Sequence, residues 1–176
     1  SGTITASGTV DTSTVGSYTI TYTAQDVSGN TSTATRTVNV INVIYVFSNK
    51  SELETAVNDW ISNETNATST YGDINTWDVI NITDMSLLFY QKSTFNSNIS
   101  NWNVSNVTNM DSMFTEASSF NQDISGWNVS SVTNMKSMFQ ETPFNQDLSQ
   151  WNVSSVTDMR YMFLWNSTFN KEIRNW

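Results

Sequence analysis

The sequence predicts a mainly β chain with short helices, made of a sheet-forming segment, a connector and an array of repeated units. Two observations lead to this fold class. Residues 1–42 alternate apolar and polar side chains with a period of two, which is typical of β-strands. From residue 77 onward, tryptophan recurs every 24 or 25 residues, which is typical of stacked repeats. All Phe, Trp and Met residues lie beyond residue 46, so the composition also changes between the two parts.

The first segment is predicted to form a β-hairpin. In SYTITYTAQ, the apolar residues Tyr18, Ile20 and Tyr22 alternate with threonine, and STATRTVNV continues the pattern to Val38 and Val40. The intervening QDVSGN is rich in residues that favour tight turns. An earlier strand is expected within residues 4–10.

The connector, residues 43–73, is predicted to carry one amphipathic helix. Ser51 and Glu54 have the spacing of a capping box at a helix start. Four apolar residues then fall on one face, and they are Leu53, Val57, Trp60 and Ile61. A short amphipathic helix before a repeat array is suited to covering the exposed end of its core. We therefore expect a capping helix.

The repeated unit reads [IL]-x-x-W-[ND]-V-x-x-[IV]-T-[ND]-M-x-x-[LM]-F, followed after a variable stretch by F-N. One apolar side chain per unit at a fixed position makes a continuous core when units stack. Each unit is expected to form a short strand and then a short helix or helical turn. The predicted core columns contain Trp77, Trp102, Trp127, Trp151, Met110, Met135, Met159, Phe114, Phe139 and Phe163.

Polar residues also recur at fixed positions. Asn and Thr columns, such as Asn96 with Asn121 and Thr108 with Thr133, are expected to satisfy backbone groups at the turns between segments. Trp165 lies outside the periodic frame and is therefore the tryptophan expected to be exposed.

Two resemblances refine the fold class. Residues 8–40, GTVDTSTVGSYTITYTAQDVSGNTSTATRTVNV, resemble the C-terminal part of the immunoglobulin-like domains of bacterial surface proteins. A full sandwich needs about seven strands and ~100 residues. The resemblance therefore implies a partial immunoglobulin-like β-sandwich over residues 1–42. Two explanations stay open, because the missing strands either precede this segment in a longer protein or come from a neighbouring molecule.

WNVSNVTNMDSMF and SFNQDISGWNVSSVTNMKSMF resemble the BspA-like branch of leucine-rich repeats, and the resemblance covers residues 50–176. It implies a leucine-rich-repeat-like solenoid over residues 74–176, which we expect to continue beyond Trp176. It also implies a secreted or surface-displayed protein with a non-enzymatic role in adhesion or protein interaction.

Composition excludes several functions. The net charge is −9, and clustered basic residues that would bind phosphate are missing, so nucleic acid is not an expected partner. Cys and His are absent, which removes disulfides, thiolate metal sites and the usual general base. No stretch is long and apolar enough to predict membrane insertion. We predict no enzymatic activity and no organic cofactor.

Calcium is the one metal for which the sequence offers a candidate site. Asp123, Asp147 and Glu172 occupy equivalent positions in successive units. Carboxylates stacked about 5 Å apart repel one another unless they are protonated or bridged by a cation, and oxygen ligands at that distance suit Ca²⁺. The alternative is an ordinary solvated acidic face.

Two functions follow from these observations. The first is a non-catalytic extracellular binding or adhesion module, whose partner is a protein or glycan at the cell surface. The second is a structural subunit of an extracellular filament or surface layer, in which copies of the chain join by strand complementation and solenoid stacking. Both share one fold, so the fold alone does not separate them.

Overall fold

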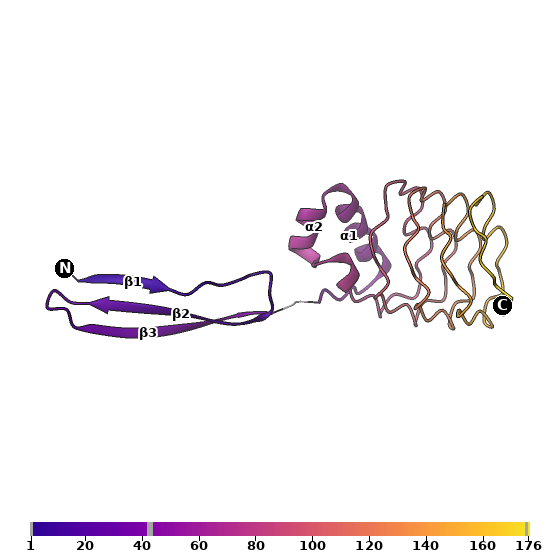
Figure 1. The fold of residues 1–176 in the computed structure, drawn as a ribbon. Helices are drawn as coiled ribbons and strands as arrows, with labels where there is room; N and C mark the ends of the chain where they lie inside the picture. Colours follow the sequence, from indigo (N-terminus) through magenta and orange to yellow (C-terminus); the bar gives the residue numbers. More distant parts are fainter. Residues whose placement is uncertain (1, 42–43, 175) are drawn as a thin grey trace. The chain divides into compact units, whose positions relative to one another are not determined.

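The computed structural model describes residues 2–41, 44–174 and 176 (Figure 1). The chain is mostly β structure with two short helices, in agreement with the sequence prediction. It divides into two compact units, Ser1–Val43 and Ile44–Trp176. The boundary predicted between residues 42 and 43 falls on residues outside the described part of the chain.

The first unit contains an antiparallel sheet with the strand order β1-β2-β3. The strands are β1 (Thr3–Ser7), β2 (Gly16–Gln25) and β3 (Thr31–Val40). Tyr22 of the central strand pairs with Ala6 on one side and with Ala34 on the other. The predicted hairpin and the earlier strand are therefore confirmed. The pairing of β2 with β3 runs along their whole length.

This sheet is open and has no buried core. None of the described residues before Phe47 is buried. Tyr18 and Ile20 are half-buried, whereas the Tyr22 side chain is 39% exposed. The half-buried residues of β2 change face along the strand, because beyond Ile20 it is Thr21 and Thr23 that are half-buried while Tyr22 is exposed. No second layer covers either face within the described residues.

Two helices follow in the second unit: α1 (Lys50–Ser62) and α2 (Glu64–Tyr71). The predicted capping box at Ser51 and Glu54 is wrong, because the helix begins two residues earlier. Asn49 is the N-cap, and its side chain accepts the Glu52 N–H at 3.0 Å, while Glu52 accepts the Ser48 N–H at 2.8 Å. Asn is as good an N-cap as Ser.

Helix α1 buries one face against the first repeat unit. Leu53, Val57 and Trp60 are buried, as the apolar spacing predicts, whereas Ile61 of the predicted face is only partly buried. Ala56 is buried as well. The Trp60 indole N–H donates to the Ser97 hydroxyl at 2.9 Å, and its ring lies edge-on to Trp77 at 5.9 Å. Helix α2 has a single buried residue, Ala67, and no apolar stripe that would have predicted it. A 3₁₀ turn, η1 (Ile74–Thr76), leads into the repeats.

The repeat units are joined by backbone hydrogen bonds between equivalent residues. Isolated parallel bridges connect Asp84 to Asn109, Asn109 to Asn134 and Asn134 to Asp158. The N–H groups of Met110, Ser112, Phe114 and Glu116 donate to carbonyls 24 residues further on, at 2.8–3.0 Å, and the neighbouring units repeat this pattern. Because each unit bonds to the next in the same register, the backbone polar groups at the unit junctions are satisfied.

Of the short strand and the short helix or helical turn expected in each unit, the described residues show an isolated bridge followed by tight turns. Between the inter-unit donors, alternate N–H groups bond three residues back, as in Leu88 to Met85 at 3.3 Å, which forms consecutive tight turns. These turns place eight non-glycine residues in the left-handed region, with φ between 54° and 63°. They are Leu87, Gln91, Ser112, Glu116, Ser137, Glu141, Tyr161 and Trp165. Bonding to the next unit replaces the hydrogen bonds that a helix would make within itself.

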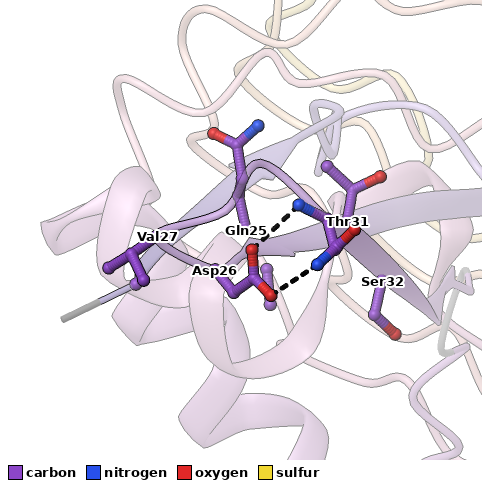
Figure 2. Close-up of a pocket in the computed structure, with 8 residues that line it drawn as sticks. Gln25, Asp26, Val27, Thr31 and Ser32 are labelled. Carbon is purple, nitrogen blue, oxygen red and sulfur yellow. Dashed lines mark hydrogen bonds between the residues drawn. The ribbon is translucent and has the colours of Figure 1, made fainter.

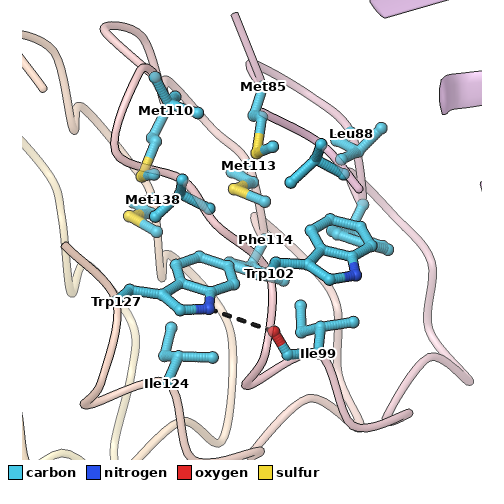
Figure 3. Packing of buried hydrophobic residues seen from close by; sticks show 14 of the residues in the cluster. Met85, Leu88, Ile99, Trp102, Met110, Met113, Phe114, Ile124, Trp127 and Met138 are labelled. Atoms are coloured by element: carbon cyan, nitrogen blue, oxygen red, sulfur yellow. Dashed lines mark hydrogen bonds between the residues drawn. The ribbon is translucent and has the colours of Figure 1, made fainter. Parts of the chain in front are cut away.

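Side chains from the repeats form a continuous core (Figure 3). Phe rings stack from unit to unit, with centroids 5.2 Å apart for Phe89 and Phe114, and 5.7 Å for Phe114 and Phe139. The indole N–H groups of four tryptophans donate to a carbonyl of the preceding unit, as in Trp127 to Ile99 at 3.2 Å, and the other three are Trp102, Trp151 and Trp176. Of the predicted core residues, two are only partly buried, Met159 and Phe163. The buried ones are Trp77, Trp102, Trp127, Trp151, Met110, Met135, Phe114 and Phe139.

Candidate functional site

Two polar columns hold the units together rather than forming a site. The Asn96 side-chain oxygen accepts the Asn121 N–H at 3.0 Å, and Asn121 accepts the Asn145 N–H at 2.8 Å. The Thr108 and Thr133 hydroxyls donate to the threonine carbonyl of the preceding unit at 3.1 Å. The prediction that these columns satisfy backbone groups is confirmed. Their side chains therefore hydrogen-bond to the backbone of the neighbouring unit.

The acidic column is held by similar local bonds. Asp123 accepts the Ser125 N–H at 2.9 Å, and Asp147 accepts the Ser149 N–H at 2.8 Å. These hydrogen bonds lower the pKa of both carboxyls, because they favour the charged form. The neighbouring Asp147 charge opposes the lowering of the Asp123 pKa. Glu172 forms an exposed ion pair with Arg174 at 2.9 Å.

The structure does not bring these three carboxylates together as one metal cluster. Within residues 2–41, 44–174 and 176, no group of three or more acidic, His or Cys side chains is close enough to hold a metal ion. The calcium hypothesis for Asp123, Asp147 and Glu172 gains no support from this geometry and stays a prediction.

A hollow of about 490 Å³ lies at the turn between β2 and β3 (Figure 2). Asp26 shapes this turn by accepting the Ser28 and Asn30 N–H groups, both at 2.9 Å, and the Asn30 side-chain amide at 2.8 Å. These bonds, above all those from Asn30, lower the pKa of Asp26. Gly29, with φ of 87°, permits the left-handed step. The polar groups of the hollow thus serve the turn itself.

Another surface carries exposed side chains that do not shape a turn or bond the backbone of a neighbouring unit. We call it the turn face, and it consists of those side chains within residues 86–91, 111–116, 136–141 and 160–165 that are not buried in the core. It includes four exposed large apolar residues, namely Leu87, Tyr90, Tyr161 and Trp165. Trp165 is 71% exposed, which confirms the prediction that it points to solvent, and Tyr161 is 57% exposed. Tyr, Trp and Arg are the residues enriched at the energetic centres of protein interfaces.

One column of the turn face combines acidic and aromatic groups. It runs through Gln91, Glu116, Glu141 and Trp165, one residue from each unit. The Gln91 amide donates to the Glu116 carboxylate at 3.0 Å, so neighbouring side chains of the column touch. A hollow of about 310 Å³ is lined by Gln91, Glu116 and Glu141 together with Ser93 and Ser118.

Sequence reasoning did not identify this column, although a signal was present. Residues that recur in every unit build the hydrogen-bonded frame and the core, so recurrence does not point to this column. Comparing the four units position by position instead shows where they differ. The position of Ser86 holds Asp111, Lys136 and Arg160 in the other units. Such variation, between an invariant Met and an invariant Phe, marks the turn face.

Comparison with known families supports a surface protein. Residues 61–176 match the family described as "Mycoplasma protein of unknown function, DUF285". The chain belongs to this family. Residues 1–40 match the family described as "Bacterial surface protein, Ig-like domain". No curated protein and no solved structure matches the chain.

The two matches together indicate a BspA-like surface protein and a module exposed at a bacterial cell surface. They agree with the resemblances seen in the sequence of both regions. No helix in the described part of the chain is long and apolar enough to cross a membrane.

Proposed function

We propose that the chain is a non-catalytic binding or adhesion module of a modular surface protein, and that residues 74–176 form a leucine-rich-repeat-like solenoid that presents the turn face to a partner. One observation carries this proposal: an almost invariant, hydrogen-bonded frame displays exposed side chains that differ from unit to unit. A scaffold that repeats its core while varying its surface is suited to recognition.

The solenoid part of the proposal is supported by the repetition of contacts. Each unit donates to the next from the same backbone positions, and the indoles of Trp102, Trp127 and Trp151 bond the preceding unit in the same way. In stacked-repeat proteins, stability is the sum of such nearest-neighbour contacts. The absence of catalytic function is supported by the chemistry of the side chains, since the chain has no Cys or His.

Attachment of coated beads tests the adhesion proposal. Beads carrying the purified chain are passed in flow over arrays of extracellular proteins and of glycans, and beads carrying serum albumin are the control. Selective attachment to one surface is expected, and the same beads coated with heat-unfolded chain should not attach. Attachment no better than that of albumin on every surface contradicts the proposal.

A structural subunit of a filament or surface layer is the second candidate function. The observation that favours it is the open sheet, since none of the described residues before Phe47 is buried. An exposed sheet edge and face are suited to accepting a strand from another copy. Electron microscopy of the purified chain and of the native source material tests this. Regular fibres that a deletion of residues 1–24 abolishes support a filament, and dispersed particles at all concentrations contradict it.

A further inference from the structure

The turn face concentrates the differences between the four units. From Met to Phe, the sequences are MSLLF, MDSMF, MKSMF and MRYMF, and the two residues after Phe are Tyr-Gln, Thr-Glu, Gln-Glu and Leu-Trp. In contrast, the segments that follow Trp102, Trp127 and Trp151 all begin with N-V-S, and the first unit differs there, with D-V-I after Trp77. The variable positions share one surface, because the inter-unit hydrogen bonds hold the units in register.

The side chains of this surface occupy backbone positions that favour glycine. Gln91, Glu116, Glu141 and Trp165 have φ between 56° and 60°. A side chain in the left-handed region costs about 1 kcal/mol or more relative to glycine, which adopts this conformation freely. None of these positions is glycine in any unit. These positions thus carry large polar and aromatic side chains, although the backbone conformation alone would favour glycine.

The chemistry of the column fits a cation. Glu116 and Glu141 lie in adjacent units, whose paired backbones are about 4.8 Å apart. Neither glutamate forms an ion pair among the described residues. Trp165 comes next in the same column and is exposed. Two carboxylates beside an indole ring match an Arg or Lys side chain, which gains both an ion pair and a cation–π contact.

Net charge favours the same partner. At −9, the chain attracts basic rather than acidic proteins. Gln91, Glu141 and Trp165 are exposed and Glu116 is half-buried, so solvent reaches most of the column. The hollow lined by Gln91, Glu116 and Glu141 is about 310 Å³, which exceeds the volume of one basic side chain.

We propose that the column Gln91, Glu116, Glu141 and Trp165 is a docking site for an Arg- or Lys-bearing segment of a partner protein. The inference rests on the proposed binding function and specifies its surface and the chemistry of its partner. The cationic head lies between the two glutamates, and the apolar stem of the basic side chain packs against Trp165.

Calorimetry with defined peptides tests the site. Twelve-residue Arg-Gly and Lys-Gly repeat peptides are titrated into the chain, with Ser-Gly and Glu-Gly repeats as controls. At least one basic peptide is expected to bind, and the tighter of the two identifies the preferred head group. Neither control is expected to bind. Absence of binding by both basic peptides overturns the proposal.

A matched pair of double variants separates the site from general charge attraction. Glu116→Gln with Glu141→Gln should weaken binding of the basic peptide at least about tenfold. Asp123→Asn with Asp147→Asn removes the same charge from another column of the same two units and should change affinity less than about twofold. Equal weakening by both pairs means that only net charge attracts the peptide, and the site is then rejected.

Trp165 provides an independent readout. It is the one exposed tryptophan among the described residues, so acrylamide quenching reports mainly on it. The bound peptide should protect it. Trp165→Gly should reduce affinity about tenfold while the melting temperature stays within about 3 °C, because glycine tolerates this φ. Full affinity in Trp165→Gly overturns the role of the indole.

The bead assay distinguishes failure of the site from failure of the proposed function. If wild-type beads attach selectively and Glu116→Gln with Glu141→Gln beads attach equally well, the chain is a binding module but this column is not its docking site. If wild-type beads do not attach, the adhesion function itself is contradicted. Loss of attachment in this double variant, with retention in the Asp123→Asn and Asp147→Asn pair, supports both.

Discussion

The sheet region, Ser1–Val43, and the repeat region, Ile44–Trp176, satisfy their backbone hydrogen bonds in different ways. β2 and β3 form ten paired positions of regular sheet, yet the described residues before Phe47 include none that is buried. The repeats contain only isolated bridges and turns, yet Phe and Trp stack through them in an unbroken core. A region can therefore have regular secondary structure without a buried core, and a buried core without regular secondary structure. Both regions have a periodic apolar pattern, but only in the repeats do the apolar side chains of one unit pack against those of the next and form a core.

The largest expected effect concerns the core of the repeats. Phe139→Ala removes a fully buried ring that stacks on Phe114, Phe144 and Phe163. It should lower the free energy of unfolding by about 3–5 kcal/mol, because it leaves a cavity. Urea unfolding followed by circular dichroism measures this. Trp165→Ala removes an exposed ring and is the control, with an expected change below about 0.5 kcal/mol. Similar losses in both variants would contradict the assignment of the core.

Hydrogen exchange compares the two regions directly. Amides of Phe114 and Phe139 bond between units and lie in the core, whereas amides of Thr21 and Thr23 lie in a sheet without buried residues. We expect the sheet amides to exchange at least about 100-fold faster, because local opening exposes little apolar surface there. Exchange read by mass spectrometry at pH 7 checks this. Equal protection in both regions would mean that something covers the sheet in solution.

A moderate effect is expected in the polar columns. Asn121→Ala deletes the oxygen that accepts the Asn145 N–H at 2.8 Å and should cost about 1 kcal/mol. Asn121→Asp keeps an acceptor at this place and should restore most of the loss. Thermal unfolding of the two variants provides the measurement. If aspartate is as damaging as alanine, the bond contributes little to the junction between the units.

The smallest effect concerns acid pH. Hydrogen bonds from Arg160 lower the pKa of Asp158 from 3.8 to about 2. A folded-state pKa below the unfolded value contributes stability that is present above about pH 3.8 and is lost as the pH falls through 2. Melting temperatures at pH 7, 4 and 2 should therefore fall more in the wild type than in Asp158→Asn. A parallel decline in both proteins would argue against this carboxyl.

The sequence predicts the repeat frame well because its residues recur. The spacing of Trp77, Trp102 and Trp127 reveals the period and the core columns, and Trp165 stands out because it departs from the frame. Regular alternation likewise reveals β2 and β3. In the repeats the burial of a side chain also follows from its place in the periodic pattern, whereas in β2 and β3 the pattern predicts the strands but not burial.

The local conformations were less predictable. Tight turns take the place of the expected short helix or helical turn, because Leu87, Ser112 and Ser137 adopt positive φ. The sequence has no glycine at these positions that would have indicated a left-handed conformation. The start of α1 depends on a choice between Asn49 and Ser51, both of which are good N-caps. The candidate site was missed because Glu116, Glu141 and Trp165 do not form a repeated motif. Their proximity arises only from the register of the units.

The identical bonding at the unit junctions has a consequence for how this protein changes during evolution. Thr108 accepts from Thr133 in the same way that Thr133 accepts from Thr157. A unit that is duplicated or deleted therefore meets a neighbour with the donors and acceptors it needs, and no core has to be redesigned. The shorter stretch at Pro143 shows that a lost residue is absorbed as well, since the Asn145 N–H still reaches Asn121. Recombination between near-identical gene segments would thus change the length of the molecule by whole repeat units, and each added unit would add one more set of turn-face residues.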